Sequence, residues 1–153
     1  MVFVAERPRG SPPPKDPLMD LVSIRLITDD VPRLVAFYER ITGVVAERPT
    51  PEFAELRTPH GTLAIGSTRT VGLFGPGSAR PADNHTAIIE FLVDDVDATF
   101  TSLADASIEI VGAPKTMPWG NRSLLVRDPD GTLVNLFTPV TPPAIAKFTD
   151  TPR

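Results

Sequence analysis

Two charged residues stand inside otherwise apolar runs, and their side chains are the ones best suited to chemistry. Arg25 lies in the run LVSIRLITDD and Glu90 in TAIIEFLVDD, at the same distance from the double Asp that ends each run. An Arg guanidinium is a rigid fork of donors for a carboxylate, phosphate or sulfonate, and a Glu carboxylate serves as a base or an acceptor. Lone charges in apolar surroundings are costly unless they are paired. The pair therefore indicates either a functional site, or two charges that neutralise each other or reach solvent.

Other reactive side chains are few. The sequence has no Cys, which excludes thiolate nucleophiles, disulfides and zinc–thiolate sites. Its two histidines, His60 and His85, are expected in a turn and just before a strand. The single Trp, Trp119, lies between a Pro and a Gly, which favours a loop. There it either stacks on a flat ligand or packs as a plug at the rim of the site.

An internal repeat places Arg25 and Glu90 on matching elements. Each apolar run predicts a strand, and the segments that follow, VPRLVAFYERITG and VDATFTSLADAS, have helical periodicity after an Asp suited to N-capping. Residues 52–65 match residues 122–135, and each segment predicts a hairpin around a Pro-polar-Gly turn. The runs 43–48 and 108–112 predict one more strand before each hairpin. Each half therefore reads strand, helix, strand, strand, strand.

Proline and glycine mark the predicted boundaries. Neither half is large enough to bury much core alone, so we expect the two to pack together. The expected units are a flexible Pro-rich leader at 1–18, a first module at 19–67, a linker at 68–84, a second module at 85–139 and a C-terminal tail at 140–153.

Composition limits the class of protein. The 153 residues are 41% hydrophobic with a formal net charge of −4, which is typical of a globular chain and argues against a nucleic-acid partner. The apolar stretches are far shorter than the ~18 residues of a membrane span, so we expect no membrane partner. Because the first residues lack the apolar core of a signal peptide, we expect a cytoplasmic location.

Three segments carry a family resemblance. DDVPRLVAFYERITG, VDDVDATFTSLADASIEI and PWGNRSLLVRDPDGTLVNLFTP resemble the vicinal oxygen chelate superfamily of glyoxalases, bleomycin-resistance proteins and ring-cleaving dioxygenases. With the repeat, the resemblance covers about residues 20–139. It implies an α+β fold of two βαβββ modules whose sheets curl into a cup around the site, with the helices outside. It also implies a homodimer.

Enzymes of that superfamily usually hold a divalent metal ion with residues on the first and last strands of each module. The positions of this sequence that correspond to those metal ligands are Ser23, Ile65, Ile88 and Asn135. Aliphatic side chains cannot ligate, and Ser and Asn are weak neutral ligands without a carboxylate to balance a hard cation. We therefore expect no metal and no other cofactor.

Alternation of strand side chains predicts what lines the cup. Asn135 either orients a ligand carbonyl or makes a structural amide bond to a neighbouring strand. Arg122, on the facing strand of the hairpin, is either a second anion contact or a solvated charge at a strand end. The candidate ligand-binding residues are Ser23, Arg25, Ile65, Ile88, Glu90, Trp119, Arg122, Asn135 and Phe137.

The resemblance implies a metal-free protein that binds a small molecule, in the manner of bleomycin-resistance proteins. The ligand is expected to be drug-like or an anionic metabolite, held in the cup and sequestered. The alternative is an enzyme of the same superfamily. That enzyme is either a metal-dependent lyase, isomerase or dioxygenase, or a metal-free catalyst with Glu90 as base and Arg25 stabilising an oxyanion.

Overall fold

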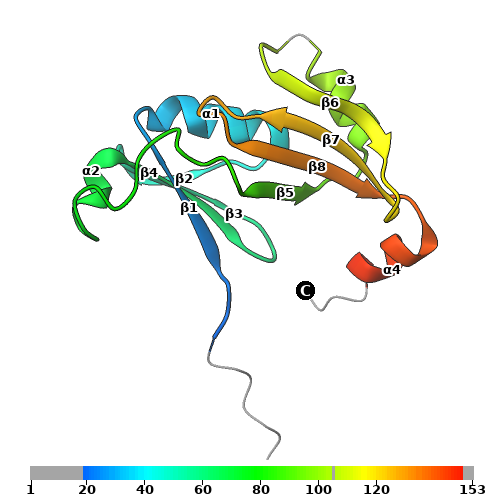
Figure 1. Cartoon of the computed structure of the whole chain (residues 1–153), viewed down its shortest axis with the longest axis horizontal. Coiled ribbons are helices and arrows are strands. Elements are labelled where there is room, and N and C mark those ends of the chain that lie inside the picture. Colours follow the sequence, from blue (N-terminus) through cyan, green and yellow to red (C-terminus); the bar gives the residue numbers. More distant parts are fainter. Residues whose placement is uncertain (1–18, 105, 150–153) are drawn as a thin grey trace, which may run out of the picture.

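The protein consists of two four-stranded sheets with helices, in the computed structural model that describes residues 19–104 and 106–149 (Figure 1). The predicted leader at 1–18 lies outside the described residues, as does the end of the tail. The first half comprises β1 (Ser23–Thr28), α1 (Val31–Thr42), β2 (Glu47–Thr50), β3 (Phe53–Arg57), β4 (Thr62–Ser67) and α2 (Thr68–Val71). The second half comprises β5 (Ile88–Leu92), α3 (Val96–Ser102), β6 (Glu109–Thr116), β7 (Asn121–Arg127), β8 (Leu133–Pro139) and α4 (Pro142–Thr149).

The two sheets share one topology. Their strand orders are β1-β4-β3-β2 and β5-β8-β7-β6. In each sheet the first and last strands pair in parallel, and the remaining neighbours pair antiparallel. The predicted α+β fold of two βαβββ units is therefore confirmed, and β1 and β5 are edge strands.

Capping residues start α1 and α3 where the sequence predicts. The Asp30 carboxylate accepts a hydrogen bond from the Arg33 backbone N–H at 3.0 Å, and Asp95 does the same for Ala98. Such caps satisfy backbone donors that have no partner within the helix. Gly43 ends α1 with a φ of +71°, a left-handed conformation that favours glycine.

Both halves contribute to a single core. Leu34 and Tyr38 of α1 are fully buried together with Leu56 of β3 and with Leu124 and Leu136 of the second sheet. Helices α1 and α3 lie on the same side of the sheets in Figure 1. Burial of apolar area across both halves is what joins them.

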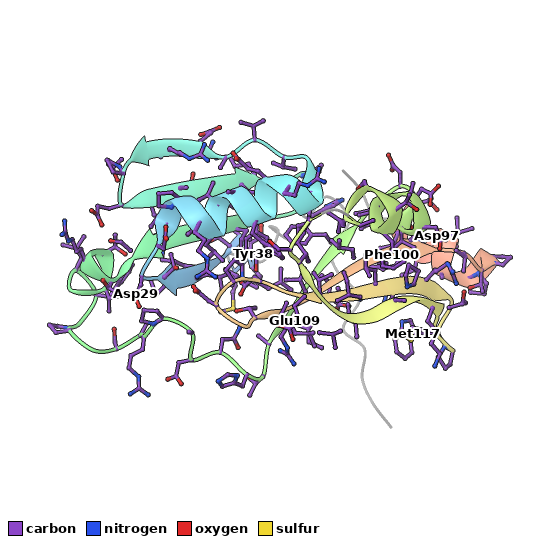
Figure 2. The ribbon with its side chains drawn as sticks, turned by 90° about the horizontal axis from the view of Figure 1, so that it is seen from above. Asp29, Tyr38, Asp97, Phe100, Glu109 and Met117 are labelled. Carbon is purple, nitrogen blue, oxygen red and sulfur yellow. The ribbon has the colours of Figure 1, made fainter. Side chains whose placement is uncertain are left out.

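A buried hydrogen bond also links the halves. The Tyr38 hydroxyl donates to Asp128 Oδ2 at 2.8 Å, across 90 positions of sequence. Figure 2 shows Tyr38 on α1, toward the second sheet. Burial raises the pKa of Tyr38, and the nearby Asp128 carboxylate raises it further. Burial also raises the pKa of Asp128, against the lowering effect of the bonds that its carboxylate accepts.

Helix α4 is an element that sequence analysis did not predict. Its first residues are Pro142 and Pro143, which suit the start of a helix because the first turn needs no N–H donors. The Phe148 ring lies 5.2 Å from the ring of Phe137 on β8. At the β6–β7 turn, Gly120 has a φ of +94° and packs tightly against Thr141 and Ala144. Among the described residues, no helix is long and apolar enough to cross a membrane.

Candidate functional site

One face of each sheet carries most of the predicted site residues. Leu26 of β1 and Ile89 of β5 pack into the core beneath the helices, so their neighbours in sequence point to the opposite face. We call this opposite side the open face. It carries Ser23, Arg25, Ile27 and Ala64 in the first sheet, and Ile88, Glu90, Leu92, Asn135 and Phe137 in the second.

The Arg25 guanidinium lies over two phenylalanine rings. Its central carbon is 4.9 Å from the ring centroid of Phe53 and 5.0 Å from that of Phe74. Such cation–π contacts hold a guanidinium without using its in-plane N–H donors. No salt bridge of the described residues involves Arg25, so the predicted neutralisation by Glu90 is not what the structure shows. Sequence analysis missed Phe53, whose face follows from its pairing with Gly66.

Glu90 is instead held by Asn135. The Asn135 side-chain amide donates to Glu90 Oε2 at 2.7 Å, between adjacent strands of the second sheet. A carboxylate only accepts, so this contact fixes Nδ2 of the amide toward Glu90. Asn135 is 7% exposed, and its Oδ1 is buried with no hydrogen-bond partner in the described chain. The structural amide bond is therefore present, and it leaves one polar atom unsatisfied beside an exposed carboxylate.

The prediction that Ile65 lines the cup is wrong. Ile65 pairs with Leu26 and is fully buried in the core. The two hairpins align in sequence without a gap, but their turns close differently. The Thr58 backbone N–H donates a hydrogen bond to the Gly61 carbonyl. The Asp128 backbone N–H donates instead to the Thr132 carbonyl, so the second turn is one residue longer. The first sheet is therefore shifted by one position relative to the second.

The Asp128 side chain explains the longer turn. Asp128 Oδ1 accepts the backbone N–H groups of Asp130 and Thr132, both at 2.9 Å. The residue that structurally matches Asn135 in the first sheet is therefore Ala64, which lies opposite Arg25 as Asn135 lies opposite Glu90.

The prediction that Arg122 reaches a ligand in the cup is also wrong. Asn135 pairs with Leu125, so Arg122 points to the helix side of the sheet. Its guanidinium donates to both carboxylate oxygens of Asp97 on α3, at 2.7 and 2.9 Å. This bidentate contact holds the pKa of Asp97 below its ordinary value. In Figure 2, Asp97 is labelled on that helix.

Two aromatic candidates lie near the second sheet. Trp119 is 66% exposed at the β6–β7 turn, which excludes the packing plug and leaves it free to contact a ligand. Figure 2 marks the same turn with Met117. Phe137 points to the open face as expected, but it is buried beneath Phe148 of α4. The covering helix was not predicted, so the burial of Phe137 was not either.

A hollow of about 270 Å³ joins the two sheets near Glu90. Its walls come from the start of β1, the β3–β4 turn and β5, including Ser23, His60 and Glu90. Ile88, beside this region on β5, is half exposed. The hollow thus brings Ser23 of the first module and Glu90 of the second to one site.

The donor set does not fit a divalent cation. With the observed strand register of the first sheet, the four positions that correspond to metal ligands are Ser23, Ala64, Ile88 and Asn135. Two of these side chains are aliphatic, and the Asn135 amide nitrogen is already directed at Glu90. Hard cations need several oxygen ligands with negative charge among them. Within the described ranges, no three His, Cys, Asp or Glu residues gather as a metal site would require.

Comparison with known proteins agrees with this architecture. The family model described as "Glyoxalase/Bleomycin resistance protein/Dioxygenase superfamily" matches residues 20–136. The chain belongs to this superfamily. The predicted resemblance is therefore confirmed at the level of the family.

Relatives are similar over most of this chain. The protein CFP32 of Mycobacterium bovis is 28% identical over 119 residues, which is 78% of this chain and 44% of CFP32. The chain thus spans less than half the length of the curated relatives it matches. A glyoxalase/bleomycin resistance protein/dioxygenase family enzyme from Burkholderia phytofirmans has a TM-score of 0.69 at 19% identity, covering 80% of this chain and all of its own. TioX from Micromonospora is 26% identical with a TM-score of 0.61, over the same shares.

Proposed function

We propose that this superfamily member binds a small anionic molecule on its open face, without a metal ion. The observation that carries the proposal is the Arg25 guanidinium, which lies over Phe53 and Phe74 and has no acidic partner among the described residues. A guanidinium held by its faces presents N–H edges to a carboxylate, sulfonate or phosphate. Phe74 is 73% exposed, so its ring is accessible to a flat ligand body.

The fluorescent sulfonate 8-anilinonaphthalene-1-sulfonate tests this proposal, because it combines an anion with aromatic rings. A hydrogen bond to a charged group contributes about 1.5–3 kcal/mol, so Arg25→Gln is expected to weaken its binding about 10- to 100-fold. Arg33→Gln is the matched control, since Arg33 is an exposed arginine on α1. Equal dissociation constants for wild type and Arg25→Gln would show that Arg25 is not the anion contact.

An uncharged probe separates charge from apolar attraction. N-phenyl-1-naphthylamine has similar rings and no anionic group. Its affinity is expected to be the same in wild type and in Arg25→Gln. If Arg25→Gln lowered the affinity for both probes equally, the substitution would be disturbing the apolar surface. The assignment of Arg25 as the anion contact would then be wrong.

We also propose that the protein forms a homodimer. Exposed apolar side chains surround the edge strands of both sheets, and such a patch usually marks an interaction site. The backbone of an edge strand is also free to pair with another chain. The exposed apolar residues of this patch are Leu21, Val22, Ile24, Ile88 and Leu92. Sedimentation velocity is expected to give twice the chain mass of 16.5 kDa, and a monomer at high micromolar concentration would refute the proposal.

Acid–base catalysis is the second candidate function, and the Glu90–Asn135 contact favours it. The amide holds the carboxylate in one orientation beside the hollow at β5. A base placed in this way removes a proton next to a carbonyl. Phenylpyruvate, an aromatic acid with such protons, is a suitable probe in D₂O. Under this hypothesis Glu90→Gln keeps phenylpyruvate binding and loses the deuterium exchange above background. Exchange that persists in Glu90→Gln removes Glu90 as the base.

A further inference from the structure

A larger cavity lies beside β1 and borders the proposed ligand site at Arg25. Its volume is about 530 Å³, within the range of small-molecule pockets. Four consecutive residues of β1, 24–27, form one wall, and the linker segment 77–84 forms another. The β7–β8 turn of the second module closes it. Figure 1 shows the linker passing β1 on its way from α2 to β5.

The cavity combines an apolar wall with acidic groups. Hydrocarbon surface comes from Ile24, Leu26 and Ile27 of β1 and from Leu34 of α1. Three carboxylates also line it, namely Asp83, Asp128 and Asp130. An apolar wall with a few polar groups is the usual lining of a site for an organic molecule.

Two of these carboxylates are already occupied. Asp128 accepts two backbone N–H groups of its own turn and the Tyr38 hydroxyl, so both of its oxygens have donors. Asp83 pairs with Arg80 at 2.8 Å. Arg25 also lines the cavity, and its guanidinium lies over two phenylalanine rings. Asp83 and Asp128 are therefore paired without a ligand in the cavity, whereas the N–H groups of Arg25 belong to the anion site proposed above.

Asp130 is the exception. Its Oδ2 atom is buried and has no hydrogen-bond partner in the described chain. No salt bridge of the described residues involves Asp130. A buried carboxylate oxygen without a donor is costly, and a cation beside the carboxylate would offset part of that cost.

We propose that this cavity is a second binding site, for a small organic cation. Its ligand carries a primary ammonium or an amidinium that donates to the Asp130 carboxylate. The apolar body of the ligand lies against the β1 and α1 side chains. The site uses Asp130 and takes a ligand of opposite charge to the one proposed for Arg25, so it does not depend on that function although Arg25 lines the same cavity.

Titration of the ¹⁵N-labelled protein with benzylammonium, followed by NMR, tests the site. The largest shifts are expected in the β7–β8 turn and the linker, at residues 77–84 and 128–132. Benzyl alcohol has the same ring and no charge, so it is expected to bind at least tenfold more weakly. Equal affinity for the two probes, or shifts centred on Glu90, would overturn the proposal.

Asp130→Asn removes the charge and keeps a residue favoured in turns. It is expected to weaken benzylammonium binding at least tenfold, and a wild-type spectrum elsewhere confirms that it folds. Asp94→Asn is the matched control, because Asp94 is an exposed carboxylate that does not line the cavity, and it is expected to leave the affinity unchanged. Unchanged affinity in Asp130→Asn would refute the site. Because Arg25 also lines the cavity, Arg25→Gln is expected to weaken sulfonate-probe binding while benzylammonium binding is kept or strengthened, so that the two proposals fail independently.

Discussion

The hydrogen bond between Tyr38 and Asp128 makes the sharpest prediction about stability, through Tyr38→Phe. The substitution keeps the ring and removes only the hydroxyl. Tyr38 is 0% exposed and Asp128 is 4% exposed, so water cannot readily replace the lost donor. The bond is 2.8 Å long and joins α1 of one half to the β7–β8 turn of the other.

The expected loss follows from the ionised acceptor. A hydrogen bond to a charged group contributes about 1.5–3 kcal/mol, and the other Asp128 oxygen keeps its two backbone donors. We therefore expect the free energy of unfolding to fall by about 2 kcal/mol at neutral pH. For a chain of this size the melting temperature falls by roughly 4–8 °C.

The pH dependence has a definite sign. Burial raises the folded-state pKa of Asp128, so its contribution to stability is full below the ordinary Asp pKa and is lost as pH rises through the folded value. The Tyr38 hydroxyl opposes this loss, because it stabilises the ionised carboxylate. The effect of Tyr38→Phe is therefore larger at neutral pH than in acid, where Asp128 is protonated.

Urea denaturation followed by circular dichroism measures these differences. The matched control is the same substitution in an Asp128→Asn background, where the ionised acceptor is absent and the loss is expected to shrink. The reasoning is refuted if Tyr38→Phe stays within about 0.5 kcal/mol of wild type at neutral pH, the range of ordinary surface substitutions.

Three other substitutions probe separate features. Gly120→Ala is expected to lower the free energy of unfolding by about 1–3 kcal/mol, which is more than Gly77→Ala. Both glycines have a positive φ, but of the two only Gly120 lacks room for a Cβ. Equal melting temperatures for the two variants would contradict this. Arg122→Gln is expected to raise the pKa of Asp97 toward its ordinary value, since the Arg122 hydrogen bond is the main cause of its lowering; an NMR pH titration with no change would exclude that cause. Leu56→Ala is expected to cost about 2–5 kcal/mol in urea unfolding because Leu56 is fully buried; a loss under about 1 kcal/mol would mean that the core refills the space.

Local signals in the sequence predicted the order of elements and the family. The helices begin at Asp30 and Asp95 because those side chains cap backbone donors within one turn. Strand periodicity placed Arg25 and Glu90 correctly on the open face, because alternation along a single strand needs no knowledge of its neighbours. The fold could be predicted because every step rested on contacts close in sequence.

Pairing between strands was the first thing that the sequence could not decide. The turns at 58–61 and 128–131 look alike, but the Asp128 carboxylate draws Thr132 into its turn and shifts the register by one residue. A one-residue shift moves side chains to the opposite face. Ile65 and Arg122 were therefore assigned to the wrong face.

Contacts between distant segments were decided by tertiary structure alone. The Arg25 guanidinium contacts Phe74, which follows α2, and does not pair with Glu90. The Phe137 ring is covered by Phe148 of α4. The cavity at Asp130 exists because the linker and a turn of the second module converge on β1. The sequence by itself determined which elements form. It also determined that Arg25 and Glu90 lie on the face of β1 and β5 opposite to the core, since both properties depend on neighbours along the chain. Only the packed structure determined which charges are paired and which carboxylate is left without a donor, since that depends on segments brought together from far apart.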